Sequence, residues 1–364
     1  FDEEWVIEDS YIRTCHSNDV LILTILPTEK CNFKCIYCYE SFAKGKMDLQ
    51  TQEAVISFVR KELKKYRSLE ISWFGGEPLL AMDVIENLST QFIKICKEQK
   101  KHYFANITTN AYLLTADVFR KLLYLNVLRY QITVDVIKEI HDKQRVLLDG
   151  SGTFDKIINN LKDIRDNIPS RLFRITIRSN LLATAENEIV RKYYEFYKKE
   201  FGHDNRFLTK YYKVWIANEN KEIENQLYPQ KDFEELLKIG KENEDNNKIF
   251  DEIGTGVYPC YAAKRNSYVI GSDAELYKCT VAFQNELKID EKGNAHIDNK
   301  KQLLFNNIGS YRKKLCNKCP LLPRCLRVKC PISQNGGNTC KDLINSNKKK
   351  MILCSDMAQK IEIV

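Results

Sequence analysis

Three cysteines stand close together near the start of the chain, at Cys31, Cys35 and Cys38. Three thiolates on one loop can bind three corners of a [4Fe-4S] cube and leave the fourth iron without a protein ligand. An iron with an open position can bind a substrate or a cofactor, so we predict that these cysteines are metal ligands and catalytic. The alternatives are a zinc ion, which would need a fourth ligand nearby, and a redox pair formed by Cys35 and Cys38.

A second motif, Gly75-Gly76-Glu77-Pro78, comes directly after an apolar run that ends at Trp73. Paired glycines let the backbone approach a ligand closely. A carboxylate can accept hydrogen bonds from an ammonium group. We therefore predict a binding turn here, although such a turn is also common in ordinary loops.

Apolar runs of strand character alternate with helical patterns through the first 215 residues. The expected strands cover residues 20–26, 69–73, 104–109, 128–134, 173–178 and 211–216, and the expected helices cover residues 50–66, 82–97, 115–125, 153–167 and 186–199. Repeated strand, helix and strand with short connections predicts parallel strands joined by right-handed crossovers. Six such units are fewer than the eight of a closed barrel, so we predict an α/β fold of the partial (β/α)6 barrel type. Reactive groups then lie on loops at the C-terminal ends of the strands.

Polar side chains stand at the ends of the later strands. Our candidates for binding a cofactor are Asn110, Asp135, Arg145, Arg178 and Asn180. An Arg fork suits a carboxylate, and Asn suits hydroxyl groups. The same residue types also cap helices, which is the structural alternative. His141, in the same region, is predicted to be a structural histidine rather than a proton shuttle.

The cysteine loop, with the aromatic Tyr37 directly before its last cysteine, resembles the cluster loop of the radical SAM superfamily. The resemblance implies that the open iron chelates S-adenosylmethionine (SAM), and that reduction cleaves SAM to methionine and a 5′-deoxyadenosyl radical. It also implies that the Gly-Gly-Glu-Pro turn binds the amino group of SAM and that the polar strand-end residues contact the cofactor. One departure is Val136, since the family usually has Gly after the Asp at this position.

Eight further cysteines lie in the last third of the chain, at Cys260, Cys279, Cys316, Cys319, Cys325, Cys330, Cys340 and Cys354. Their spacing resembles the SPASM extension of peptide-modifying radical SAM enzymes, which carries two auxiliary [4Fe-4S] clusters, so three clusters are expected in all. The resemblance implies one cluster on Cys316, Cys319, Cys325 and Cys340, and another on Cys260, Cys279 and Cys330, with Cys354 as its fourth ligand or spare. Ala274 stands where the family usually has Gly. Two four-cysteine zinc sites are the alternative. Cys96 is predicted to be a buried small apolar residue, and Cys15 is left unassigned.

These patterns divide the chain into four expected parts. Residues 1–19 form an N-terminal arm or, over Trp5 to Ile12, an edge strand; residues 20–216 form the partial barrel; residues 217–257 form a polar bridging segment; and residues 258–364 form the small cysteine-rich SPASM domain.

Composition excludes several classes of partner. The chain has 364 residues and a formal net charge of +8, and its basic residues are spread over the whole length, often beside Asp or Glu. No RRM, KH or helix-turn-helix pattern accompanies them, so we expect no nucleic-acid partner. The apolar run at residues 20–26 is far shorter than the ~18 residues of a membrane span, so we expect no membrane partner. Thirteen cysteines without a secretory signal favour metal or redox chemistry over disulfides.

The residue after Cys279 separates two branches of the family that the sequence resembles. In the sulfatase-maturating branch an Asp directly after such a cysteine serves as a base, whereas here Thr280 follows it. A hydroxyl is a poor proton acceptor, so we predict the branch that abstracts hydrogen from a ribosomally made precursor peptide and forms a thioether or carbon-carbon crosslink. The alternatives are anaerobic sulfatase maturation, which oxidises Cys or Ser to formylglycine, and an inactive cluster-binding scaffold.

The resemblance also implies partners and a location. We expect a precursor peptide or protein substrate and an electron donor such as flavodoxin or ferredoxin. No separate leader-recognition domain precedes Val20 in this sequence, so we expect leader recognition to need either a separate leader-recognition chain or an N-terminal segment that this sequence does not include. Exposed cubes of this kind are oxygen-labile, which implies the reducing cytoplasm of an anaerobic or facultative bacterium.

Overall fold

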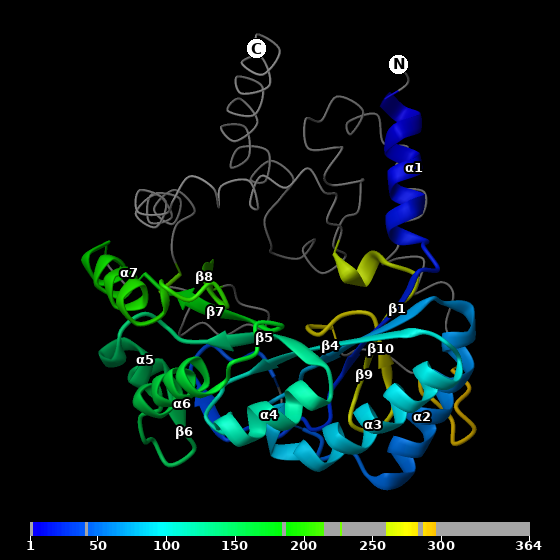
Figure 1. Ribbon diagram of the computed structural model, residues 1–364, viewed down its shortest axis with the longest axis horizontal. Coiled ribbons are helices and arrows are strands. Elements are labelled where there is room, and N and C mark those ends of the chain that lie inside the picture. The colour runs from blue at the N-terminus through cyan, green and yellow to red at the C-terminus, as the bar shows by residue number, and fades with distance from the viewer. Residues whose placement is uncertain are drawn as a thin grey trace.

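The structure is a computed structural model, which describes residues 3–40, 43–183, 187–214, 226–227, 260–282 and 287–295 (Figure 1). Six predicted cluster ligands lie outside the described residues: Cys316, Cys319, Cys325, Cys330, Cys340 and Cys354. The described residues contain Cys31, Cys35 and Cys38, together with Cys260 and Cys279 of the later set.

An eight-stranded sheet is the centre of the molecule, with the strand order β10-β9-β1-β3-β4-β5-β7-β8. Seven of these strands run parallel, and six of the seven follow one another in chain order: β1 (Val20–Ile25), β3 (Ser68–Trp73), β4 (His102–Thr109), β5 (Val127–Thr133), β7 (Arg174–Leu181) and β8 (Phe207–Lys213). The predicted α/β architecture with six parallel strands is therefore confirmed. The last of them begins at Phe207 rather than at residue 211, since Phe207 already pairs with Ile175 of β7.

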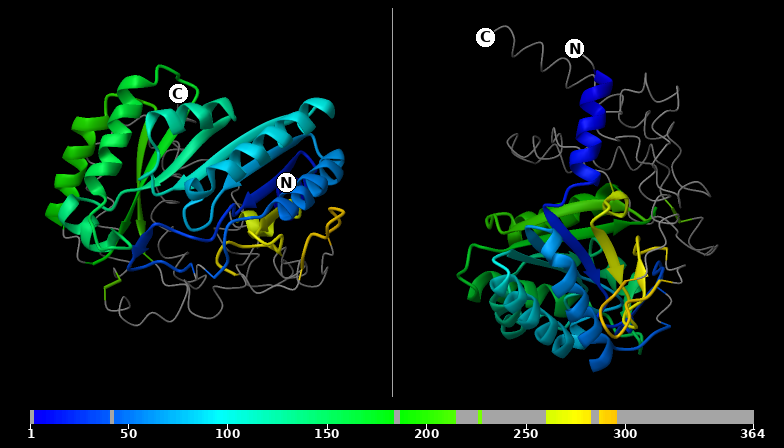
Figure 2. Two further views of the ribbon diagram at one scale, coloured as in Figure 1. Left: turned by 90° about the horizontal axis from the view of Figure 1, so that it is seen from below. Right: turned by 90° about the vertical axis from the view of Figure 1, so that its right-hand side faces the viewer.

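The helices that connect these strands lie along one face of the curved sheet (Figure 2). They are α2 (Leu49–Glu62), α3 (Met82–Glu98), α4 (Ala116–Tyr124), α5 (Lys138–Gln144), α6 (Phe154–Asn167) and α7 (Asn187–Phe201), with short 3-10 turns η1 (Leu63–Lys65) and η2 (Pro78–Ala81). Two of the helices begin at side-chain caps that the sequence carries. Asp48 accepts a hydrogen bond from the backbone N–H of Thr51 at 2.7 Å, and Thr115 accepts one from Val118 at 3.3 Å.

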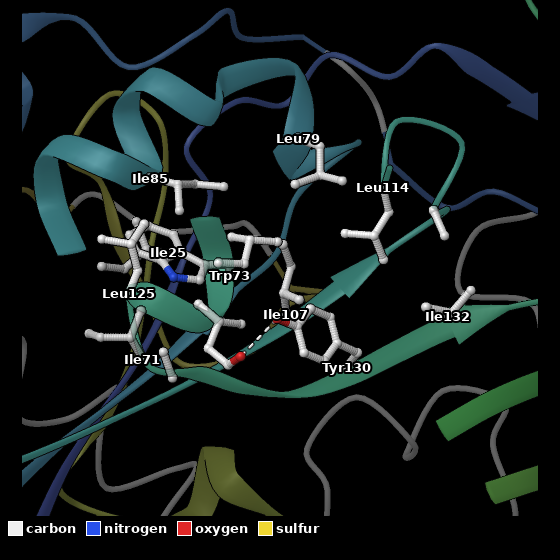
Figure 3. Close-up of a cluster of buried hydrophobic side chains, with 14 of the residues drawn as sticks. Ile25, Ile71, Trp73, Leu79, Ile85, Ile107, Leu114, Leu125, Tyr130 and Ile132 are labelled. Carbon is white, nitrogen blue, oxygen red and sulfur yellow. Dashed lines mark hydrogen bonds between the residues drawn. The ribbon is translucent and has the colours of Figure 1, made fainter. Parts of the chain in front are cut away.

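The hydrophobic core lies between the helices and the sheet. Figure 3 shows Ile25, Ile71, Trp73, Ile107 and Ile132 of successive parallel strands facing Leu79 and Ile85, which come from η2 and α3. Burying one large apolar side chain stabilises the fold by roughly 1.5–3 kcal/mol. Cys96 on α3 belongs to the same core at 1% exposure, as predicted.

The sheet extends beyond the six expected strands on the β1 side. β9 (Ser267–Ile270) pairs in parallel with β1, and β10 (Leu276–Tyr277) pairs antiparallel with β9. A 3-10 turn, η4 (Tyr261–Ala263), precedes this hairpin. A segment that we expected in a separate cysteine-rich domain therefore continues the sheet of the barrel.

The N-terminal segment differs from the expected edge strand. It is a helix, α1 (Glu3–Cys15), with an ion pair between Arg13 and Asp9 one turn apart at 2.7 Å. A helix satisfies its backbone groups internally, and the edge of β1 at which a strand could have paired is occupied by β9. The interpretation of Trp5 to Ile12 as an edge strand is therefore wrong. No helix in the described part of the chain is both long enough and apolar enough to cross a membrane.

Candidate functional site

The three clustered cysteines lie on the segment that leaves the C-terminal end of β1. Cys35 ends a short strand, β2 (Phe33–Cys35), which pairs antiparallel with β6 (Arg145–Leu147) and sets Cys35 opposite Arg145. A tight turn follows, in which the N–H of Cys38 donates to the carbonyl of Cys35 at 3.2 Å. Cys31 and Cys35 are half-buried, and Cys38 is exposed.

The three thiols share an environment that disfavours the free thiolate. Loss of solvation around the sulfurs raises the pKa of Cys31 to about 12 and that of Cys38 to about 11, and Cys35 raises both further by charge repulsion. Burial also raises the pKa of Cys35. Thiols of this kind are protonated at neutral pH unless a positive centre binds them, so the set fits a metal group that supplies that charge.

The spacing of the three thiols in this loop suits a cluster. A mononuclear zinc site draws its ligands to one point, and among the described residues no three His, Cys, Asp or Glu side chains are arranged to hold one ion. A [4Fe-4S] cube takes one thiolate for each iron, so its sulfurs need not converge on one point.

Amide groups lie around the sulfur of Cys31. The backbone N–H of Phe33 donates to this sulfur at 3.3 Å, and the side-chain amide of Asn110, at the end of β4, lies 4.0 Å from it. The same amide donates to Asn32 Oδ1 at 2.8 Å. Asn110 therefore lies against the cysteine loop in this structure, and its predicted contact with SAM stays a prediction.

The paired glycines allow a close approach within the chain itself. Gly75 has φ of +111°, and a Cβ there would lie 2.3 Å from the carbonyl oxygen of Thr28; a Cβ on Gly76 would lie 2.5 Å from that of Lys30. The turn thus packs directly on the backbone that leads into the cysteine loop, and the N–H of Glu77 donates to the Lys30 carbonyl at 2.9 Å.

The carboxylate of Glu77 is fully buried and satisfied by neighbours. Its Oε1 accepts hydrogen bonds from Thr109 Oγ1 at 2.7 Å and from the N–H of Leu79 at 3.0 Å, and its Oε2 accepts one from the N–H of Asn110 at 2.7 Å. Burial raises the pKa of Glu77, and these three donors act against that rise. The side chain joins the ends of β3 and β4, and Pro78 begins η2 directly after it. A contact between Glu77 and an ammonium group of SAM stays a prediction.

Four of the predicted cofactor residues form one hydrogen-bonded network. The hydroxyl of Tyr37 donates to Asp135 Oδ2 and receives hydrogen bonds from Arg145 Nη1 at 3.1 Å and Asn180 Nδ2 at 3.4 Å. The backbone N–H of Asn180 also donates to Asp135 Oδ1 at 3.0 Å. The ends of β5 and β7 are thereby tied to the cysteine loop through one tyrosine hydroxyl.

The turn after Asp135 is strained. Val136 has φ of +41° and is fully buried, a backbone conformation that β-branched residues rarely adopt. The N–H of Asp135 donates to His141 Nδ1 at 3.1 Å, and His141 Nε2 lies 3.0 Å from Thr153 Oγ1. His141 is fully buried in these contacts, which is the structural role predicted for it. Surrounding hydrogen bonds therefore hold a turn for which the resembled family uses glycine.

Arg178 lies beside this network. Its Nε donates to Asn180 Oδ1 at 2.8 Å, and its guanidinium lies 4.1 Å from the ring centroid of Tyr212 on β8. It can orient Asn180, and its predicted contact with a carboxylate stays a prediction.

The segment with Cys260 and Cys279 lies against the cysteine loop, through residues that each directly follow a cysteine. The hydroxyls of Tyr261 and Thr280 are 3.0 Å apart, and the N–H of Thr280 donates to the Tyr261 hydroxyl at 2.9 Å. Thr280 also hydrogen-bonds the side chain of Tyr39. Sequence reasoning missed this cluster, although a hydroxyl-bearing residue after each of three cysteines was a visible signal.

A second polar contact joins the same two segments. Lys44 Nζ lies 2.7 Å from Asp273, 2.9 Å from Glu275 and 2.9 Å from the hydroxyl of Tyr277. Ala274 in this hairpin has φ of +67°, so the second position at which glycine was expected also has a left-handed backbone.

Comparison with known proteins identifies a family and a related protein for this sequence. Residues 25–183 match the model of the Radical SAM superfamily. The cysteine-type anaerobic sulfatase-maturating enzyme of Clostridium novyi is 27% identical over 355 residues, which cover 85% of this chain and 89% of that protein.

Two solved structures have a similar fold. A structure of anSMEcpe with bound AdoMet matches with a TM-score of 0.69 at 18% identity, over 93% of this chain and 100% of that one. A structure of Streptococcus suis SuiB bound to its precursor peptide SuiA matches with a TM-score of 0.61 at 17% identity, over 88% and 74% of the two chains. At these identities the likeness extends to the fold alone.

Proposed function

We propose that this chain, whose residues 25–183 match the Radical SAM superfamily, is a peptide maturase that abstracts a hydrogen atom from a precursor peptide and forms a thioether or carbon-carbon crosslink. A radical SAM domain implies one [4Fe-4S] cluster and SAM. Cys31, Cys35 and Cys38 are the residues that would hold the cluster. Together with SAM, that cluster supplies a 5′-deoxyadenosyl radical when it is reduced.

The chain's own residues orient this loop. The Gly-Gly-Glu turn packs on the backbone before Cys31, and Glu77 ties the ends of two strands beneath it. Tyr37 anchors the loop to Asp135, just after β5, and to Asn180 on β7. Because these contacts order the loop before the reaction, little entropy is lost in positioning the reacting groups during it. The predicted SAM contacts within this frame are Tyr37, Gly75, Gly76, Glu77, Pro78, Asn110, Asp135, Arg145, Arg178 and Asn180.

Thr280 is the observation that favours crosslinking over sulfatase maturation. Its hydroxyl is hydrogen-bonded to Tyr261, and burial raises the pKa of both Tyr261 and Tyr39. None of these three hydroxyls is a proton acceptor near neutral pH. A reaction that needs a carboxylate base directly after Cys279 is therefore disfavoured in this chain.

Anaerobic sulfatase maturation is the second candidate. The alignment with the cysteine-type sulfatase-maturating enzyme of Clostridium novyi covers 85% of this chain and 89% of that protein, and it supports this candidate. Both candidates act on a peptide or protein, and they differ in the product.

Auxiliary clusters and partners complete the proposal. Cys260 and Cys279 would supply two ligands of one auxiliary [4Fe-4S] cluster, and a second would lie on cysteines outside the described residues, which gives three clusters in all. We further propose an electron donor of the flavodoxin or ferredoxin kind and a separate chain that recognises a leader peptide.

Mass spectrometry of the peptide product separates the two candidates. Anaerobically reconstituted protein, SAM and dithionite are incubated with the product of any short cysteine-containing reading frame found beside this gene and, separately, with a peptide carrying the cysteine of a sulfatase site. We expect the neighbouring peptide to lose two hydrogens and gain a crosslink, and the sulfatase peptide to stay unchanged. Conversion of the sulfatase cysteine to an aldehyde would overturn the crosslinking assignment.

A further inference from the structure

Arg145 is a buried cation next to the cysteine loop. Only 7% of its surface is exposed, and it lies directly opposite Cys35 in the ladder between β2 and β6. Its guanidinium lies 5.6 Å from the ring centroid of Phe33, two residues before Cys35. The charge is therefore held at the backbone that carries the thiols.

Among the residues that the structure describes, the guanidinium has no direct anionic partner. Its Nη1 donates to the hydroxyl of Tyr37 at 3.1 Å, and Asp135 is reached only through that hydroxyl. Its Nε is buried and has no hydrogen-bond partner among the described residues. Among the described residues, no carboxylate lies within 4.0 Å of the side-chain nitrogens of Arg145. By contrast, the buried guanidinium of Arg206 is paired with Asp204 at 2.6 Å.

An unpaired buried charge is costly, and buried Arg is normally paired with an anion. Cys35 lies directly opposite Arg145 in the ladder, and the charge of its thiolate would be the largest favourable charge acting on the guanidinium. The buried positive charge of Arg145 thus lies beside the loop on which an iron–sulfur group would carry negative charge.

We propose that Arg145 is the counter-charge of the cluster on Cys31, Cys35 and Cys38 and raises its reduction potential, a role that rests on the proposed function. Reduction adds one negative charge to the cluster, so a fixed positive charge nearby stabilises the reduced form more than the oxidised form. Tyr37 is the positioning residue in this arrangement, because its hydroxyl orients the guanidinium.

This role differs from binding the carboxylate of SAM. Charge compensation changes the potential of the cluster before SAM is added, whereas a contact with SAM changes only SAM affinity. The two roles therefore separate in an experiment that contains no SAM.

The test is a redox titration without SAM, followed by electron paramagnetic resonance (EPR). The signal of a variant with all three loop cysteines changed to Ala is subtracted, which leaves the cluster on this loop. Arg145→Met and Arg145→Lys are compared with wild type, and Arg178→Met is the matched control, since it removes a cation that stacks on Tyr212 instead. Iron content and thermal unfolding of each variant establish that it is folded and loaded.

We expect a more negative potential in Arg145→Met and a smaller change in Arg145→Lys, which keeps the charge. We expect the smallest change in Arg178→Met. Tyr37→Phe keeps the arginine but removes the hydroxyl that orients it, so this variant should shift the potential in the same direction by less than Arg145→Met. It also tests the proposal if Arg145→Met fails to fold. A loaded cluster with the wild-type potential in Arg145→Met would overturn the counter-charge role alone. If Arg145→Met does not fold, the same result in Tyr37→Phe would overturn it. A wild-type protein without a cluster on this loop would overturn the proposed function itself.

Discussion

The two cysteine-bearing segments of the described chain come to lie beside β1 by different routes. The loop with Cys31, Cys35 and Cys38 leaves β1 directly and is surrounded by buried polar groups from the ends of the next strands. The segment with Cys260 and Cys279 arrives beside β1 through β9, where the N–H of Leu26 donates to the carbonyl of Ile270 at 2.9 Å.

The difference shows how each segment depends on the barrel. The first loop has its neighbours supplied by consecutive strands, so the fold of the barrel alone positions it. The second segment is held by a short hairpin and by half-exposed contacts such as Lys44 with Glu275. We therefore expect damage at the first loop to abolish the chemistry, and damage at the second to leave its first step intact.

The largest expected effect comes from removing one cysteine in each segment. Cys35→Ala should abolish the EPR signal that changes when SAM is added, since that cluster loses a ligand. Cys279→Ala should lower the iron content but keep the SAM-dependent signal. Equal loss of this signal in both variants would contradict the separation of the two segments.

Changing the buried carboxylate beneath the first loop should have the next largest effect. Glu77→Gln places an amide NH2 against a backbone N–H in either orientation, because both carboxylate oxygens accept from backbone donors. A buried polar group left unsatisfied costs about 1–3 kcal/mol, so we expect the free energy of unfolding to fall by that amount. The measurement is denaturant unfolding of the protein without metal.

Lys44→Met is the matched change in the hairpin contact. Its partners are about one-third exposed, so we expect a loss of at most about 1 kcal/mol. A larger loss from Lys44→Met than from Glu77→Gln would reverse the proposed ranking of the two regions.

Acid should weaken the first region in particular. Burial, and after it the charge of Arg145, lowers the pKa of His141 well below its usual value. As the pH falls, His141 therefore binds a proton in the unfolded chain before it does so in the folded chain. The free energy of unfolding that His141 contributes is complete above about pH 6.5. Below that pH it is lost by up to about 1.4 kcal/mol per pH unit. Melting temperatures at pH 7.5 and 5.5 should differ more in wild type than in His141→Gln. Equal differences in the two proteins would exclude His141 as the acid-sensitive group.

The smallest effects are expected at the two left-handed turns. An L-residue pays roughly 1–2 kcal/mol for this conformation, so Ala274→Gly in the hairpin should stabilise slightly, by at most about 1 kcal/mol. Val136→Gly also removes a fully buried side chain worth roughly 1.5–3 kcal/mol, so it should destabilise. Opposite signs are the expected outcome of thermal unfolding, and stabilisation by both changes would show that the Val136 side chain contributes nothing.

The sequence predicted those parts of the molecule that depend on local pattern. Apolar runs and helical periodicity placed the six parallel strands, and the cysteine spacing placed the loop after β1. Those features depend on neighbours within a few residues, or on the rule that parallel strands end at one edge.

Contacts between distant segments could not be predicted in the same way. β9 pairs with β1 although nearly the whole barrel lies between them in sequence. The hydrophobic periodicity of a strand does not predict which strand it pairs with. The left-handed conformations of Val136 and Ala274 are likewise imposed by surrounding hydrogen bonds rather than by the residues themselves. Glu77 and Asn110 were singled out as polar residues at strand ends, but only the structure shows that they bond to each other.

The most direct test of the central claim is the formation of 5′-deoxyadenosine. Anaerobically reconstituted protein is mixed with dithionite and SAM, and the products are separated and quantified. We predict 5′-deoxyadenosine and methionine in equal amounts, formed by wild type and not by Cys35→Ala. Folded, iron-loaded protein that yields no 5′-deoxyadenosine would contradict the account.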